Sequence, residues 1–109
     1  LFACLKSGDR VILPADGYYV TRVLATEFLQ GLGVTVEMLP TAAFDRADLT
    51  AAVVYVETPS NPGLDVCDIA AVVARAKTAG ARVIVDNTTM TPFLQRPLDL
   101  GADLAVAAD

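Results

Sequence analysis

Three short polar segments follow apolar runs in this chain, and each carries side chains that could bind or transform a ligand. Glu57 opens the segment Glu57-Thr58-Pro59-Ser60-Asn61-Pro62, in which two prolines end the preceding run abruptly. Asp86 directly follows Val83-Ile84-Val85, and Asp16-Gly17-Tyr18-Tyr19 follows the first apolar run. A carboxylate at the edge of a buried sheet is poorly solvated, so Asp86 needs a donor or a cation, for which a protonated heterocyclic nitrogen would serve. A tyrosine ring beside it could stack on a flat ligand.

Each of these segments also has a simpler explanation, which the residue types alone leave open. Ser60 and Asn61 could bond their own backbone in an ordinary turn, and Asp86 could cap the turn that follows it. Tyr18 and Tyr19 could be half-buried packing residues with their hydroxyl groups in water.

The composition excludes several classes of function. The chain of 109 residues is 54% hydrophobic, has a net charge of -5 and contains no histidine. The lack of histidine excludes Ser-His-Asp and Cys-His catalysis within the chain and most zinc sites. Without a basic stretch or an apolar run of about 18 residues, we expect neither nucleic acid nor membrane as a partner. Cys4 and Cys67 form no disulfide framework, and we expect both to be reduced thiols in a cytoplasmic protein.

The elements that must position these side chains alternate along the chain. Apolar β-rich runs follow Gly8, Gly33, Gly80 and Gly101, and a fifth such run covers 52–56. Apolar residues with a helical period predict helices over 18–30 and 68–79, with Asp68 as N-cap, and we expect a short helix over 45–51. Because Pro92 and Pro97 interrupt it, the segment 88–100 should be mostly loop.

Alternating strands and helices predict an α/β fold with a mostly parallel sheet. Ligands bind beyond the carboxyl ends of the strands in such sheets, where all three polar segments are expected to lie. Gly31-Leu32-Gly33 is not a dinucleotide fingerprint, because it precedes a strand and lacks a third glycine. Since Leu1 and Asp109 both resemble interior positions, we interpret 1–109 as a single internal segment of a larger domain.

Taken in order, the motifs resemble the Cys/Met-metabolism pyridoxal-phosphate enzymes, which include cystathionine γ-lyase and cystathionine γ-synthase. The matching pieces are Asp16-Gly17-Tyr18, Glu57 to Pro62, Val85 to Thr88, and Thr91 to Asp103, so the resemblance covers essentially the whole chain. It implies the large domain of the fold-type I pyridoxal-phosphate enzymes and pyridoxal 5'-phosphate as cofactor.

The resemblance also implies a role for each matching residue. Asp86 would pair with the pyridinium nitrogen of the cofactor and keep it protonated. Tyr18 would stack over the ring and assist proton transfer, although Tyr19, which stands where many members have glycine, could compete for that place. Asn61 would lie near the phenolic oxygen of the cofactor, Thr88 would pack close to the ring, and Glu57 would lie near the site.

Two further features of the family motif bear on the phosphate and the lysine. The family has a Ser-x-Thr-Lys motif after the last strand, whose lysine forms the Schiff base; Ala108 stands in place of the serine, and the lysine would fall about two residues beyond Asp109. Lys6 and Lys77 lie in predicted helices away from strand ends, so we expect neither to be that residue. The 109 residues alone would therefore lack the Schiff-base lysine.

The activity implied by the resemblance is cleavage of a sulfur-containing amino acid, preferentially γ-elimination from cystathionine. Cystathionine γ-synthase or another γ-replacement enzyme is the alternative, and a non-catalytic truncated remnant is the alternative of another class. The resemblance also implies a small amino-acid substrate and a homotetramer.

Overall fold

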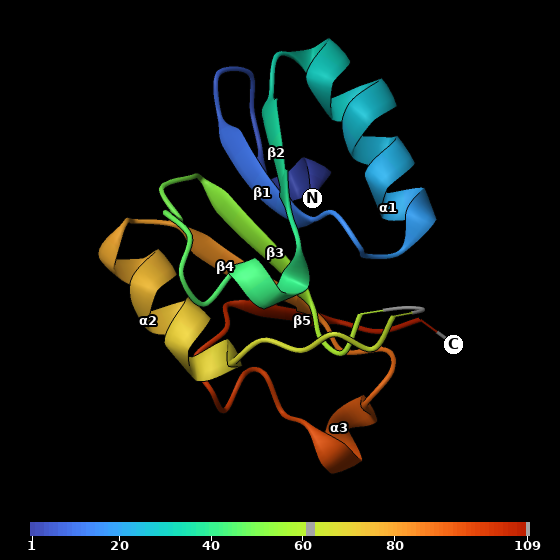
Figure 1. Cartoon of the computed structure of the whole chain (residues 1–109). Helices are drawn as coiled ribbons and strands as arrows, with labels where there is room; N and C mark the ends of the chain where they lie inside the picture. Colours follow the sequence, from blue (N-terminus) through green and yellow to red (C-terminus); the bar gives the residue numbers. More distant parts are fainter. Residues whose placement is uncertain (61–62, 109) are drawn as a thin grey trace.

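The computed structural model describes residues 1–60 and 63–108, and its framework is one sheet of five parallel strands (Figure 1). The spatial order is β2-β1-β3-β4-β5. The strands are β1 (Arg10–Pro14), β2 (Thr35–Leu39), β3 (Val53–Glu57), β4 (Arg82–Asp86) and β5 (Leu104–Val106). The predicted α/β fold with a parallel sheet is confirmed, and each strand coincides with one of the five apolar runs.

Helices cover both faces of the sheet, which explains why the central strands are apolar throughout. Every residue of β3 is buried. Alternate residues of the strands enter two separate cores, one on each face of the sheet. Val54 and Val56 pack in the core under α2 (Ile69–Thr78), whereas Val53 and Tyr55 pack in the core that holds Ala25 and Leu29.

The two longer helices begin and end where their sequences indicate. The Asp68 side chain accepts a hydrogen bond from the Ala71 backbone N–H (3.2 Å) and caps α2 as predicted. The helical segment 19–32 starts as α1 (Tyr19–Leu24), widens into a π turn, η2 (Ala25–Leu29), and closes with a 3-10 turn, η3 (Gln30–Leu32). Gly33 ends it with a φ of 86°, a left-handed conformation that glycine adopts without strain. In the described part of the chain, no helix has the length and apolar character needed to cross a membrane.

The prediction of a short helix over 45–51 is wrong. A 3-10 turn, η4 (Thr41–Ala43), lies before it, and 45–51 is irregular. Two contacts explain the difference. The Asp48 carboxylate accepts hydrogen bonds from the backbone N–H and hydroxyl of Thr50, which closes a local turn instead of a helix. The Arg75 guanidinium donates to the carbonyls of Phe44 and Ala47, which a helix would have used itself.

Short elements complete the chain. A 3-10 turn, η1 (Phe2–Cys4), precedes β1, and α3 (Thr91–Leu94) is a single turn within the segment 88–100 that was predicted to be mostly loop. Because all five strands are parallel, their carboxyl ends meet at one edge of the sheet. The strand order changes direction between β1 and β3, and the crevice at such a point is where ligands bind in open α/β sheets.

Candidate functional site at the carboxyl edge of the sheet

Parallel pairing brings two of the predicted carboxylates side by side. Glu57, the last residue of β3, lies in register with Asp86, the last residue of β4. Both line a pocket of about 140 Å³ at the carboxyl edge of the sheet. The other residues that line this pocket are Tyr18, Thr88, Thr89 and Ala108. Four of the five predicted site residues therefore meet at one place, and the fifth, Asn61, lies outside the described residues.

Asp86 is half-buried, and its two carboxylate oxygens have different partners. Oδ1 accepts hydrogen bonds from the Thr88 backbone N–H (3.1 Å) and the Thr88 hydroxyl (2.6 Å). Oδ2 lies 3.3 Å from the hydroxyl of Tyr55, which donates to it. Each carboxylate oxygen has two lone pairs, so Oδ2 keeps the capacity to accept a further donor.

The bonds between Asp86 and Thr88 also match the simpler explanation given for the sequence, in which the Asp86 carboxylate caps the turn that follows it. Asp48 makes the same turn with Thr50, at 3.0 Å to the backbone N–H and 2.6 Å to the hydroxyl, in an exposed loop. The turn by itself therefore indicates no ligand. Asp86 differs from Asp48 in its place at the carboxyl edge of the sheet, its contact with Tyr55 and its position in the pocket wall.

Glu57 is 6% exposed and holds the first turn of α1. Its Oε2 accepts a hydrogen bond from the Tyr18 backbone N–H at 2.7 Å. Burial raises the pKa of the Glu57 carboxyl, and the charges of Asp86 and Asp16 raise it further, against the opposing effect of the Tyr18 N–H. Glu57 and Asp86 thus form a negatively charged wall that would suit a cationic group.

The two adjacent tyrosines have different surroundings. Tyr18 lines the pocket, and its residue surface is 50% exposed, so its ring is free to contact a ligand. Tyr19 is 66% exposed and lies against Arg22, whose guanidinium carbon is 5.7 Å from the centre of the Tyr19 ring. Arg22 also donates to the Gly17 carbonyl (3.1 Å), so it stabilises the turn before α1.

Asp16 stabilises the loop between β1 and α1 through two bonds with Thr41. Its Oδ1 accepts hydrogen bonds from the backbone N–H (2.8 Å) and the hydroxyl (2.9 Å) of Thr41, which is fully buried. Burial alone would raise the pKa of the Asp16 carboxyl, but the two bonds from Thr41 outweigh it, and the pKa is lowered. Asp16 is therefore a structural residue of the loop after β1.

Three residues at or next to the candidate site could not be assigned from the sequence. Tyr55 was expected only in an apolar strand, yet its hydroxyl reaches the carboxylate of the neighbouring strand. Asn87 and Gln95 do not line the pocket, but Asn87 directly follows Asp86 and the two amides are bonded to each other. Both residues are visible in the sequence as polar residues within 87–95, but the hydrogen bonds between them depend on how the loops are arranged in space.

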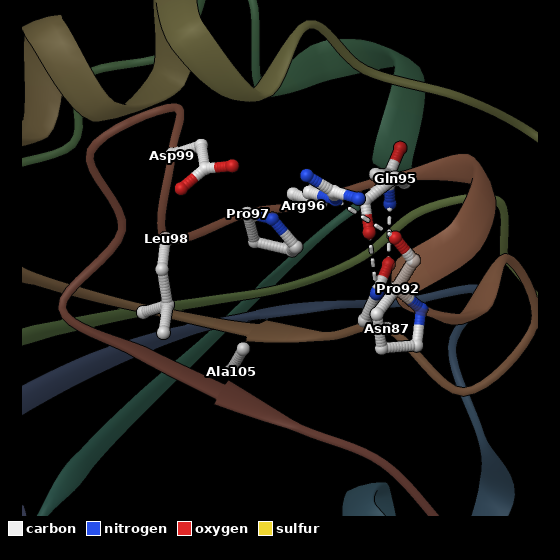
Figure 2. Close-up of a pocket in the computed structure, with 8 residues that line it drawn as sticks. All are labelled: Asn87, Pro92, Gln95, Arg96, Pro97, Leu98, Asp99 and Ala105. Carbon is white, nitrogen blue, oxygen red and sulfur yellow. Dashed lines mark hydrogen bonds between the residues drawn. The ribbon is translucent and has the colours of Figure 1, made fainter.

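Another cavity, of about 250 Å³, is lined in part by Asn87 (Figure 2). Its walls are mostly apolar, and it holds neither Asp86 nor Tyr18. The residues that line it are Asn87, Pro92, Gln95, Arg96, Pro97, Leu98, Asp99 and Ala105. The grouping of a carboxylate pair with an exposed aromatic ring marks the smaller pocket as the candidate site.

Neither lysine contributes to the candidate site. Lys77 lies 3.9 Å from the carboxylate of Asp103, in an exposed pair near the end of α2. Lys6 lies between η1 and β1 and not in a helix, contrary to the prediction, and it stands at the opposite edge of the sheet from the pocket. Among residues 1–60 and 63–108, the lining of the pocket includes two carboxylates and an aromatic ring but no Lys or Arg.

Comparison with known proteins identifies the family to which the chain belongs. The model of the Cys/Met metabolism PLP-dependent enzymes matches residues 1–109. A Streptomyces coelicolor protein provisionally named cystathionine gamma-lyase is 46% identical over 99% of the chain, and the cystathionine beta-lyase of Bacillus subtilis is 41% identical over 96%. The crystal structure of cystathionine gamma-lyase from Lactobacillus plantarum, complexed with L-serine, superimposes on 97% of the chain with a TM-score of 0.88 and 34% identity.

These proteins are much longer than the chain. The chain spans 28% of the length of both curated relatives and 29% of the Lactobacillus plantarum structure. The match nevertheless extends over all 109 residues, and the predicted resemblance is confirmed. The chain belongs to the Cys/Met metabolism pyridoxal-phosphate-dependent enzymes, a family that implies pyridoxal phosphate as cofactor.

Proposed function

We propose that the whole protein cleaves a small sulfur-containing amino acid with the help of pyridoxal phosphate, preferentially by γ-elimination from cystathionine. The observation that carries this proposal is the placement of Asp86 and Tyr18 in one pocket at the carboxyl edge of the sheet. The relatives named as cystathionine gamma-lyases and a cystathionine beta-lyase support the substrate class.

The residues present fit the ring of the cofactor. A pyridine ring has a nitrogen that can carry a proton and two flat faces, and the pocket offers a carboxylate for the first and a half-exposed phenol ring for the second. Pyridoxal phosphate, when bound, supplies an electron-accepting ring for bond cleavage at the substrate. The described part of the pocket wall offers no cation for its phosphate group.

Asp86 would hold the proton on the ring nitrogen. Oδ1 is occupied by Thr88, so Oδ2 is the oxygen that would accept a hydrogen bond from the protonated nitrogen, and the buried Glu57 carboxylate beside Asp86 adds to the negative potential. Thr88 acts through Asp86, because its hydroxyl donates to Oδ1 and accepts from the Ala108 backbone N–H (2.9 Å).

Tyr18 would stack on the ring and move a proton during the reaction, with its backbone held by Glu57. Glu57 therefore acts in the proposed site chiefly by positioning Tyr18. From the resemblance we propose that Asn61 contacts the phenolic oxygen of the cofactor. We also propose that 1–109 is part of the cofactor-binding large domain.

Two further properties of the whole protein belong to this proposal. We propose a homotetramer, consistent with the family resemblance, and light scattering of the purified protein would measure its mass. We propose a cytoplasmic protein, consistent with the free thiols of Cys4 and Cys67.

The decisive experiment compares Asp86→Asn with Asp48→Asn in the whole natural protein. Both variants alter an aspartate in the same kind of turn with a threonine, but only Asp86 lines the pocket. Loss of a charged hydrogen-bond partner is worth about 1.5–3 kcal/mol, so Asp86→Asn should weaken pyridoxal phosphate binding and slow cysteine release from cystathionine about 10- to 100-fold. Asp48→Asn should match the wild type.

The result that contradicts the proposal is equal behaviour of the two variants, or a wild type that takes up no pyridoxal phosphate. The latter would favour the non-catalytic remnant. Formation of cystathionine from cysteine and an activated homoserine, in place of its cleavage, would indicate the γ-replacement alternative.

A further inference from the structure

The side chains of Asn87 and Gln95, which lie just beyond β4 and α3, form a closed set of hydrogen bonds. The Gln95 amide nitrogen donates to Asn87 Oδ1 and to the Thr58 carbonyl, both at 2.9 Å. The Asn87 amide nitrogen donates to the Gln95 carbonyl, also at 2.9 Å (Figure 2). A primary amide has two hydrogens, so both donors of Gln95 are used.

These bonds tie together the two strand ends that carry the carboxylates of the site. Thr58 directly follows Glu57 at the end of β3, and Asn87 directly follows Asp86 at the end of β4. The Asn87 backbone N–H also donates to the Val106 carbonyl of β5 at 2.8 Å. Gln95 is the C-cap of the single turn α3, so it brings this turn against both strand ends.

The chemistry of the amide suits this place better than other side chains of similar size. Gln95 faces two oxygen atoms, the Thr58 carbonyl and Asn87 Oδ1, so a carboxylate there would meet two acceptors. An apolar side chain would leave both oxygens without this donor, and Asn87 is 4% exposed. The position therefore favours a side chain that carries two hydrogen-bond donors.

We propose that Gln95 is a positioning residue of the cofactor site, which fixes the backbone just beyond Glu57 and Asp86 and so holds the Asp86–Thr88 turn in place at the pocket. Gln95 does not line that pocket and acts through Thr58 and Asn87. This inference rests on the proposed function, because it gives the hydrogen bonds of Gln95 to Thr58 and Asn87 a role in the pyridoxal phosphate site. The alternative is that the pair only stabilises the fold.

The test compares Gln95→Met with Gln30→Met in the whole natural protein. Methionine keeps the length of the side chain and removes the donors. Gln30 is exposed at the end of a helix, so its variant controls for the change of residue type. Three quantities are measured: the dissociation constant for pyridoxal phosphate, the absorbance bands of the bound cofactor at saturation, and Tm.

We expect Gln95→Met to raise the dissociation constant about tenfold, the scale of one buried acceptor left without its donor. The ratio of the absorbance bands should change even at saturating cofactor, because Asp86 is no longer held in place, and Gln30→Met should match the wild type. A purely structural role would lower Tm and leave both the spectrum and the dissociation constant unchanged, which would overturn the proposal.

If Gln95→Met yields no folded protein, Asn87→Ala decides. This variant removes the Asn87 acceptor and donor but leaves the bond from Gln95 to the Thr58 carbonyl, so it should show a smaller change in the same direction. A wild-type dissociation constant and spectrum for Asn87→Ala would overturn the proposal. If the wild type binds no pyridoxal phosphate, the proposed function is overturned as well. If the wild type binds it, and Gln95→Met has the same dissociation constant and the same spectrum, only this inference is overturned.

Discussion

Glu57 holds Tyr18 by its backbone: Oε2 of the buried carboxylate accepts the Tyr18 N–H at 2.7 Å, although the two residues are 39 positions apart in the sequence. The bond joins the end of β3 to the start of α1, across the point where the strand order changes direction. It leaves the Tyr18 ring half-exposed at the pocket.

This relationship explains why residue 17 is glycine. A Cβ at Gly17 would lie 2.8 Å from Glu57 Oε2 and 2.8 Å from Cγ of Pro14, closer than side-chain carbons approach other atoms. We expect Gly17→Ala to lower the free energy of unfolding by about 1–3 kcal/mol, as overpacking does. The matched control is Gly31→Ala, since nothing lies within 4 Å of a Cβ there. Urea denaturation of both variants measures the difference, and equal stability would contradict the crowded turn.

The two bonds from Asp16 to Thr41 should be important for stability. Asp16→Ala leaves the backbone N–H and hydroxyl of the fully buried Thr41 without their acceptor. We expect a loss of about 2–4 kcal/mol in the free energy of unfolding. Asp9→Ala is the control, because the Asp9 carboxylate accepts only an exposed bond from Lys6 and should change stability by less than about 1 kcal/mol. Similar losses in the two variants would show that Thr41 finds another partner.

Glu57 should make stability depend on pH. Because burial and the charges of Asp86 and Asp16 raise its pKa above the ordinary value of 4.5, the folded protein binds this proton more tightly than the unfolded chain. Its contribution to stability is therefore fully present below pH 4.5 and falls as the pH rises through the raised pKa. Glu57→Gln keeps an oxygen for the Tyr18 N–H and removes the titration.

The stability of Glu57→Gln relative to the wild type should consequently increase between pH 4 and pH 7. Chemical denaturation at a series of pH values measures this difference. A difference that is constant over the range, or that decreases, would show that the Glu57 carboxyl titrates alike in the folded and unfolded states.

Tyr55→Phe tests the second partner of Asp86. The change removes the hydroxyl 3.3 Å from Asp86 Oδ2 and leaves the buried ring in place. Since burial raises the pKa of Tyr55, the phenol stays protonated and can donate at neutral pH. We expect a threefold to tenfold weaker affinity for pyridoxal phosphate, the scale of one net hydrogen bond of about 1 kcal/mol. Titration of the cofactor absorbance measures it, with Tyr19→Phe as the control outside the pocket.

The order of elements was predictable because it depends on local patterns. Buried strands need continuous apolar runs, and Asp68 caps α2 through an atom three residues away. The helix expected over 45–51 failed because Arg75, about 28 residues away along the chain, donates to the carbonyl of Ala47. A contact of that kind leaves no periodic signal in the segment it changes.

In the candidate site, too, local patterns were predictable and contacts between distant residues were not. Glu57, Asp86 and Thr88 were expected at strand ends, and parallel register brings Glu57 beside Asp86 as that expectation required. The hydroxyl of Tyr55 and the amide of Gln95 could not be assigned, because their partners lie on a neighbouring strand and on two separate loops. Their bonds depend on lateral register and loop geometry rather than on spacing along the chain.

The complete burial of β3, up to and including Glu57, has a consequence for how such a site can evolve. Val53, Val54 and Val56 are constrained by packing alone, so substitutions there should act mainly through the abundance of the folded protein. Tyr55 and Glu57 alternate with these valines and also contact groups of the candidate site, so substitutions there should lower both abundance and turnover. A saturation mutagenesis library scored separately for soluble yield and for turnover would thus distinguish neighbouring residues of one strand.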